Sequence, residues 1–162
     1  MHNEQDRLHA LHDLNVLDTS PEPALDELVE FARQRFMVPT AFISLVAESR
    51  QWFKAKAGLD VGEASREHAF CDHTIRQRQV LVVEDARVDP RFMNNPFVIG
   101  PPRIRFYAGA PLIYKQQAIG SFCIINKDPR SFSDTDRKDL VVLAKATVAE
   151  LEMSRARRFL LP

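Results

Sequence analysis

The order of helix-like and strand-like segments along this chain of 162 residues predicts an α+β fold. Amphipathic helical segments stand at both ends, and short apolar strand-like runs fill the middle, with one short helix among them. Parallel strands need long crossover connections, which are usually helices, and here almost none is available. The sequence therefore predicts a mostly antiparallel sheet, with the terminal helices collected on one of its faces.

The N-terminal quarter of the chain predicts two helices with a break between them. Residues 4–17 form the first helix, and a stretch containing two prolines interrupts it. Ser20 is expected to cap the second helix, with Pro21 at its first position, where no amide donor is needed. Pro39 closes this helix. The apolar positions at helical spacing are Leu8, Leu11 and Leu14 in the first helix and Leu25, Leu28, Val29, Ala32 and Phe36 in the second.

The central part of the chain predicts five strands. The first two are expected to form an antiparallel hairpin, because a short polar turn separates them. The last two are joined by another short turn at residues 115–117. The strands are expected at residues 41–47, 51–57, 80–84, 106–114 and 118–126.

The C-terminal segment predicts one long helix at residues 133–160. Ser133 supplies a cap, and Asp134 and Asp136 place carboxylates in the first turn, where the helix dipole favours them. An apolar stripe follows and continues toward Phe159. The stripe consists of Leu140, Leu143, Ala144, Thr147 and Leu151.

Length and composition indicate a soluble protein of one domain, residues 1–162, with an N-terminal helical segment at residues 1–17. Lys+Arg 22 balance Asp+Glu 22, so the charge gives no reason to expect nucleic-acid binding. The chain has two cysteines, no signal-peptide pattern and no apolar run of spanning length. These features predict a reduced, cytoplasmic protein that does not insert into a membrane.

The segment EHAFCDH, residues 67–73, gathers two histidines, a cysteine and two carboxylates. On a helix His68 and Cys71 share a face while His73 points away, and on a strand His68 is the one excluded. Cys123 could add a ligand from a strand, yet a structural zinc site usually needs four protein ligands. The sequence therefore predicts no metal site here. A free cysteine is more often a small buried hydrophobe.

The segment of residues 85–103 breaks the compact pattern, because it is long, contains four prolines and lacks periodicity. Connections of this length often serve as lids or binding loops. The alternative is a surface loop that Phe92 and Phe97 anchor to the domain. In such a loop Asp85 and Asp89 would accept hydrogen bonds from backbone amides. The sequence favours neither interpretation over the other.

Seven short motifs follow one another along nearly the whole chain. They are LDT at 17–19, RQWFKA at 50–55, FCDHTI at 70–75, VEDA at 83–86, DPRF at 89–92, RFYAGAPL at 105–112 and IGSFC at 119–123. In this order the chain resembles a GAF domain, of the type found in bacterial sensor histidine kinases and diguanylate cyclases. The resemblance covers roughly residues 5–155.

The resemblance implies a central antiparallel sheet of five or six strands, with the terminal helices on one face and a pocket on the other. Loops and short helices, including EHAFCDH and the 85–103 segment, would cover that pocket. Gly109 within a strand predicts a close approach by other atoms. Phe106 and Tyr107 on the same strand place one aromatic ring on each face of the sheet, so one of them is expected to face the pocket. No covalently bound cofactor is expected. The candidate ligand-binding residues are Phe53, Cys71, His73, Asp85, Asp89, Phe92, Phe106, Tyr107 and Cys123.

The resemblance also implies a sensory role. We expect the domain to bind an unidentified small-molecule ligand and to relay the state of its pocket through its terminal helices. We further expect a homodimer, and fusion or partnership with a kinase or cyclase output domain. The dimer would pair through Leu8, Leu11 and Leu14 together with the stripe from Leu140 to Leu151.

Enzymatic activity is not expected, because no catalytic constellation is assembled. Two alternatives stay open. One is a small thiol-based redox or methionine sulfoxide-reducing enzyme that uses Cys71 and Cys123. The other is a ligand-free scaffold for dimerisation.

Overall fold

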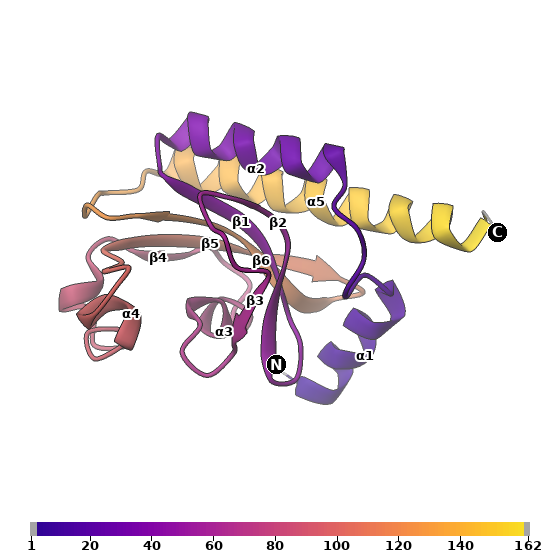
Figure 1. Cartoon of the computed structure of the whole chain (residues 1–162), viewed down its shortest axis with the longest axis horizontal. Helices are drawn as coiled ribbons and strands as arrows, with labels where there is room; N and C mark the ends of the chain where they lie inside the picture. Colours follow the sequence, from indigo (N-terminus) through magenta and orange to yellow (C-terminus); the bar gives the residue numbers. More distant parts are fainter. Residues whose placement is uncertain (1–2, 161–162) are drawn as a thin grey trace.

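The computed structural model of the chain describes residues 3–160. In this part of the chain, five α-helices, one short 3-10 helix and six strands form a layered unit (Figure 1). The helices are α1 (Glu4–Leu14), α2 (Pro23–Phe36), α3 (Phe70–Thr74), α4 (Pro96–Ile99) and α5 (Asp134–Leu160), and the 3-10 helix is η1 (Ala86–Val88). The strands are β1 (Thr40–Val46), β2 (Arg50–Ala57), β3 (Glu63–Ser65), β4 (Leu81–Val83), β5 (Phe106–Tyr114) and β6 (Gln117–Asn126).

All six strands belong to one antiparallel sheet with the order β3-β2-β1-β6-β5-β4. This confirms the predicted α+β fold, and each of the five expected strands forms. The sixth strand, β3, was not predicted, because the three residues EAS are too few to show alternation.

Helices cover both faces of the sheet. In Figure 1, α2 and α5 lie side by side over one face, whereas α3 and α4 lie on the opposite face. The helix α1 packs against β6 and α5 at one end of the sheet. No helix within residues 3–160 is long and apolar enough to cross a membrane.

Two apolar clusters fill the two sides of the sheet. The first cluster joins the sheet to α1, α2 and α5, and the second joins it to α3, η1 and α4. Most of the residues expected to pair two chains lie in the first cluster, where Leu11, Leu14 and Leu140 are fully covered and Leu151 is 1% exposed. Leu8 is half-buried and lies outside it. Apart from Leu8, the side chains predicted to form the dimer face belong to this chain's own core, so that part of the prediction is wrong, and the homodimer itself stays a prediction.

Two helix ends differ from the prediction. The second helix begins at Pro23, and its N-cap residue Glu22 makes no side-chain hydrogen bond to it. Ser20 is not the cap, because it lies two residues before the N-cap position; its carbonyl accepts a hydrogen bond from Lys54 Nζ in the connection before the helix. The first helix ends early, because Asn15 adopts a left-handed conformation with φ 52°.

The start of α5 agrees with the sequence. The Ser133 hydroxyl accepts a hydrogen bond from the Asp136 amide at 3.0 Å, and the Asp136 carboxylate accepts one from the Ser133 amide at 3.1 Å. This reciprocal pair is a capping box. From it α5 continues for 27 residues and projects past the sheet (Figure 1).

The segment of residues 85–103 is ordered by η1 and α4. The carboxylates of Asp85 and Asp89 each accept a hydrogen bond from the backbone amide two residues on, as predicted. Phe92 is buried and anchors the segment, but Phe97 is 38% exposed and does not. The segment is therefore a fixed cover over the second cluster, held at one aromatic side chain rather than two.

Candidate functional site

Five of the predicted ligand-binding residues come together in the second cluster. Phe53, Cys71, Phe92, Tyr107 and Cys123 all lie there, and each is buried. They come from β2, α3, the 85–103 segment, β5 and β6, so the site depends on the whole fold. They belong to one cluster of buried side chains, and their role in ligand binding stays a prediction.

Phe106 lies on the other face of the sheet, so its assignment to the pocket is wrong. Its ring packs against Phe132, with the ring centroids 5.5 Å apart, in the cluster beneath α2 and α5. Successive side chains of a strand point to opposite faces, and the next residue, Tyr107, is the one that enters the second cluster.

A polar centre lies inside the second cluster. Cys71 Sγ and Cys123 Sγ are 3.3 Å apart. Ser121 Oγ lies 3.2 Å from Cys71 Sγ and 2.6 Å from Cys123 Sγ, and Tyr107 Oη lies 3.6 Å and 3.1 Å from the same two atoms. Thr74 Oγ1 completes the centre at 2.7 Å from Tyr107 Oη. We call these five residues the thiol–hydroxyl centre.

The pKa values in this centre are shifted in different directions. Burial raises the pKa of the Cys71 thiol, but hydrogen bonds from Cys123, Ser121 and Tyr107 outweigh burial, and the net shift is downward. The pKa of the Cys123 thiol is raised by burial and by its contact with Cys71. The pKa of the Tyr107 phenol is also raised, by burial and then by the two cysteines. Cys71 is therefore the thiol that ionises first, and Tyr107 stays a hydrogen-bond donor.

Gly109 makes room for the thiol–hydroxyl centre. A Cβ atom at this position would lie 2.2 Å from Tyr107 Oη and 2.9 Å from Thr74 Oγ1. Such distances are well below van der Waals contact, so only glycine leaves the tyrosine hydroxyl in its place. The close approach predicted from a glycine within a strand is confirmed.

Aromatic rings of α3 and the 85–103 segment close the site from outside. Phe70 stacks on Phe92, with ring centroids 4.1 Å apart and an angle of 7° between the ring planes, and Phe70 also lies 5.1 Å from the Tyr107 ring. His73 meets Phe92 edge-on at 4.7 Å. Burial lowers the pKa of His73, which favours a neutral imidazole. EHAFCDH is thus the cover of the site, with Cys71 facing inward and His73 at the rim.

The two predicted aspartates stay outside the site. Asp85 pairs with Arg87 at 2.8 Å, and Asp89 pairs with Arg91 at 2.7 Å. These ion pairs shape the covering segment. Beside it lies an open hollow of about 400 Å³, lined in part by His73 and Arg91. Within residues 3–160, no three His, Cys, Asp or Glu side chains gather closely enough to hold a metal ion.

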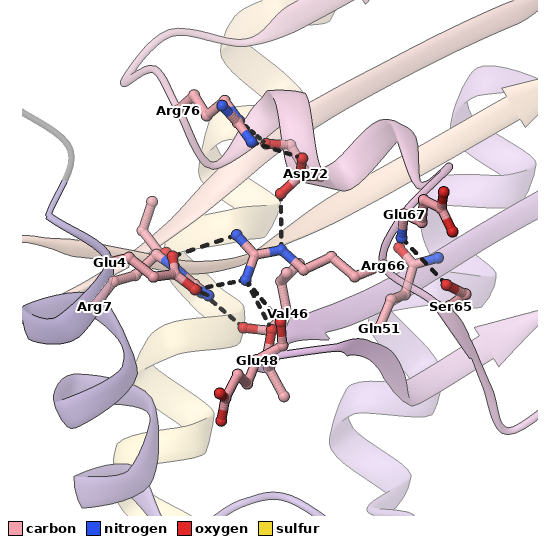
Figure 2. Close-up of polar contacts among 12 residues, drawn as sticks. Glu4, Arg7, Val46, Glu48, Gln51, Ser65, Arg66, Glu67, Asp72 and Arg76 are labelled. Atoms are coloured by element: carbon pink, nitrogen blue, oxygen red, sulfur yellow. Dashed lines mark hydrogen bonds and ion pairs between the residues drawn. The ribbon is translucent and has the colours of Figure 1, made fainter. Parts of the chain in front are cut away.

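Sequence reasoning missed a group of charged residues, one of them fully buried, that ties α3 to α1. Arg66 donates to Glu4 Oε2 at 2.5 Å and to Asp72 Oδ1 at 2.8 Å, so its guanidinium bridges the two helices (Figure 2). Arg7, which is 1% exposed, also binds Glu4 and donates to the Val46 carbonyl at 2.7 Å. The sequence did carry a signal, because Arg7 stands at helical spacing on the same face as the buried leucines of α1.

A second buried ion pair joins β2 to α5. The Lys54 side chain is fully covered, and its Nζ lies 2.7 Å from Glu22 Oε2 and 2.8 Å from Thr19 Oγ1. The other carboxylate oxygen of Glu22 accepts a hydrogen bond from Ser154 in α5. Burial opposes ionisation of Glu22, but the interactions with Lys54, Ser154 and Arg158 together outweigh it, and the pKa of Glu22 is lowered. A lysine among apolar neighbours in a strand was the sequence signal for this junction.

Comparisons with known proteins agree with the architecture. A family model described as the GAF domain matches residues 20–151. A cyclic di-GMP phosphodiesterase of Pseudomonas aeruginosa is 36% identical over 160 residues, which is 98% of this chain and 27% of that protein. The chain therefore corresponds to only part of the length of this relative.

Solved structures with the same fold have low sequence identity. The GAF domain of a phosphoenolpyruvate-protein phosphotransferase from Coxiella burnetii has a TM-score of 0.71 and 17% identity, over 98% of this chain and 99% of that one. The free methionine-R-sulfoxide reductase of Neisseria meningitidis has a TM-score of 0.68 and 19% identity, over 93% of this chain and 90% of that one. At these identities the likeness concerns the fold. The chain belongs to the GAF domain family, whose members are small-molecule sensory and regulatory modules.

Proposed function

We propose that this domain regulates a signalling output by passing the state of the covered site beneath α3 to the end of α5. The observation that carries the proposal is the surface of α5, which presents a second apolar stripe to solvent. Val142 is 63% exposed, Met153 57% and Leu160 77%. The spacing of four and three residues alternates along the whole stripe, which we call the α5 seam. It consists of Val142, Ala146, Ala149, Met153, Ala156 and Leu160.

A heptad spacing of this kind suits pairing with a second copy of the chain in a parallel coiled coil. The seam residues take the a and d positions, and the flanking e and g positions then face each other across the two helices. In the parallel arrangement Lys145 of one copy faces Glu150 of the other, and Glu152 faces Arg157. Both contacts join opposite charges, which favours this partner and this direction.

The seam can be tested with two methionines of similar chemistry. Met153→Glu places a charge within the seam, whereas Met37→Glu changes a methionine that is 85% exposed and lies outside it. We expect sedimentation equilibrium to give a dimer for the unaltered chain and for Met37→Glu, and a monomer for Met153→Glu. A monomeric unaltered chain at high protein concentration, or equal behaviour of the two variants, would contradict the seam.

A continuous set of polar contacts supports the route of the relay. Asp72 on α3 binds Arg66, and Arg66 binds Glu4 at the start of α1. At the other end of α1, the Asp13 carbonyl accepts a hydrogen bond from Arg155 Nε of α5 at 2.7 Å. Contact alone does not establish coupling, which needs a measured interaction energy. A double-mutant cycle between Asp72→Asn and Arg155→Ala, read by hydrogen exchange of α5, measures it, and additive effects would rule the route out.

The output that we propose is a signalling enzyme attached to or bound by the end of α5. The relative that is 36% identical is a cyclic di-GMP phosphodiesterase, which favours cyclic di-GMP turnover over the kinase alternative. Fusing residues 1–160 to such a catalytic domain tests this. Inserting one residue after Leu160 should change the activity by altering the helical phase, whereas inserting seven should restore it. Equal activity with both insertions would contradict transmission through α5.

The packing of the second cluster favours a second candidate function, a scaffold that binds no ligand. Phe70, Phe92 and Tyr107 occupy the space where the family fold predicts a pocket. A thermal-shift screen of metabolites, including cyclic dinucleotides, separates the candidates. A stabilising ligand whose effect is lost in Phe92→Ala supports the sensor, and the absence of any shift favours the scaffold.

We propose that the domain does not act as a methionine sulfoxide reductase. Cys71 and Cys123 are 1% and 0% exposed, so an amino-acid substrate cannot reach either sulfur atom in the closed site. The measurement is turnover of free methionine sulfoxide with a small dithiol reductant. Turnover by the unaltered chain that disappears in Cys71→Ser would overturn this proposal.

A further inference from the structure

The thiol–hydroxyl centre offers a chemistry that the proposed relay does not use. Its two sulfur atoms are 3.3 Å apart, and a disulfide bond needs about 2.05 Å. A small movement of α3 toward β6 would therefore bring them to bonding distance. Neither sulfur is bonded to the other in the structure, and both cysteines are free and buried.

The hydrogen bonds of this centre converge on one of the two sulfurs. The Thr74 hydroxyl can donate to Tyr107 Oη, which leaves the Tyr107 hydrogen free to point at Cys71 Sγ. Ser121 donates to the same atom at 3.2 Å, and the Cys123 thiol lies at 3.3 Å. One sulfur surrounded by three donors is an environment for a thiolate. The arrangement therefore gives Cys71 the role of nucleophile and leaves Cys123 as the neighbouring thiol.

We infer that Cys71 and Cys123 are an oxidisable dithiol whose oxidant is a small hydroperoxide such as hydrogen peroxide. The Cys71 thiolate attacks one peroxide oxygen, the O–O bond breaks, and the departing hydroxide takes up a proton to become water. Cys71 is then a sulfenic acid. Cys123 attacks its sulfur, the S–S bond forms, the S–O bond breaks, and a second water leaves with the thiol proton. Two thiols are oxidised to one disulfide, and one peroxide is reduced to two waters.

Burial determines which oxidants can enter. The ring of Phe70 and the segment around Phe92 cover both sulfurs, so a disulfide reagent or a peptide is excluded. The helix α3 has five residues and no side-chain N-cap, and short elements of this kind open locally at low cost. Hydrogen peroxide is close to water in size and can enter during such openings.

Oxidation of the two cysteines would shift α3 and so change contacts that lie outside the thiol–hydroxyl centre. Cys71 and Asp72 are neighbours on this helix, and Asp72 binds Arg66, which binds Glu4 of α1 (Figure 2). Drawing Cys71 toward β6 moves the partner of Arg66. The redox state of the dithiol thereby acts on the same contacts that support the relay, but the oxidation itself does not depend on the relay.

The test treats the folded chain with hydrogen peroxide, denatures it, alkylates free thiols and measures the intact mass. We expect the unaltered chain to lose two alkylation sites and two hydrogens, without dimers on a non-reducing gel. Cys123→Ser should stop at a sulfenic acid on Cys71, which dimedone added together with the denaturant traps, and Cys71→Ser should keep its thiol. The bulky reagent 5,5′-dithiobis(2-nitrobenzoate) should leave both thiols intact in the folded chain.

The two tyrosines provide a matched pair for the mechanism. Tyr107→Phe removes one donor to Cys71 and should slow oxidation by about tenfold, a typical effect of one hydrogen bond. Tyr114→Phe removes a hydroxyl that donates to Asp13 at the surface and should leave the rate unchanged. The inference is wrong if peroxide leaves both thiols free in the folded unaltered chain while oxidising them in urea. It is also wrong if both cysteine variants, shown to be folded by circular dichroism, react at equal rates.

Discussion

The two faces of the sheet use the same strands but differ in chemistry. Phe106 and Phe122 point toward α2 and α5 into a cluster of large apolar side chains. Their immediate neighbours Tyr107 and Cys123, together with Ser44, point the other way and bring hydroxyl and thiol groups into the interior. Burying polar groups costs stability unless they are hydrogen-bonded. The difference indicates that the face packed against α2 and α5 stabilises the fold. The face beneath α3 instead keeps buried thiol and hydroxyl groups that a core does not need.

The largest expected effect contrasts two neighbours on β6. Phe122→Ala should lower the free energy of unfolding by about 3–5 kcal/mol, because it leaves a cavity between the sheet and the helices α2 and α5. Cys123→Ala removes a smaller side chain from the other face and should cost about 1 kcal/mol. Urea unfolding measures both values. Similar losses would mean that the two faces contribute equally to stability, which is contrary to the comparison.

A smaller effect is expected from filling the space beside the tyrosine hydroxyl. Gly109→Ala places a Cβ atom 2.2 Å from Tyr107 Oη and should cost about 1–3 kcal/mol by overpacking. Combining it with Tyr107→Phe removes the closest clashing atom, so the double variant should lose less than the sum of the two. Strict additivity in urea unfolding would show that the hydroxyl is not the atom that requires glycine.

The charges that join the two sides respond to pH. Burial opposes ionisation of Glu4, but hydrogen bonds and attraction from Arg7 and Arg66 lower its pKa from 4.5 to about 2. A carboxyl group with a lowered folded-state pKa stabilises the fold above its unfolded pKa and loses this effect as the pH falls through the folded value. The unaltered chain should therefore melt higher than Glu4→Gln at neutral pH. The difference should persist down to about pH 4.5, shrink below it and vanish near pH 2. A difference in melting temperature that is constant over this range would contradict the assignment.

The smallest effect on stability is expected at the α5 seam. Val142→Thr keeps the shape of the side chain but weakens an apolar contact that is 63% exposed in one copy. At low protein concentration the free energy of unfolding from urea denaturation should stay within about 0.5 kcal/mol of that of the unaltered chain. At high concentration only the unaltered chain should gain stability, because pairing stabilises the folded state by mass action. A loss that is independent of concentration would place Val142 in the core.

The sequence was sufficient for most of the fold, because apolar periodicity decides which segments are helices and which are strands. It was harder to determine from the sequence which face of the sheet each side chain of a strand points to. Phe106 and Tyr107 are equally aromatic, and only the register of β5 between β4 and β6 decides which ring meets α3. The end of α1 and the start of α2 were misplaced for a related reason. Before α2, the Ser20 carbonyl and the Thr19 hydroxyl accept hydrogen bonds from Lys54, which is remote in sequence.

Only part of the candidate site was predicted from the sequence, because Ser121 and Thr74 were not among the candidates. Cys71, Tyr107 and Cys123 were identified as neighbours, since motifs of one family place them so. Their 3.3 Å sulfur contact and the filled space around them depend on packing between α3 and the sheet, which no local pattern encodes. The bridge of Arg66 was missed because its partners Glu4 and Asp72 lie on two different helices.

The two halves of α5 are held by different forces. Up to Leu151 the helix is held by a continuous apolar stripe, supplemented near its start by ion pairs of Arg35 with Asp136 and Asp139. Beyond that residue its contacts with the protomer include the hydrogen bond of Ser154 with Glu22 and those that Arg155 and Arg158 donate to backbone carbonyls at the end of α1. Apolar packing is insensitive to moderate salt, whereas exposed charged contacts are screened by it. We therefore expect added salt to loosen the outer turns of α5 more than the turns that precede Leu151.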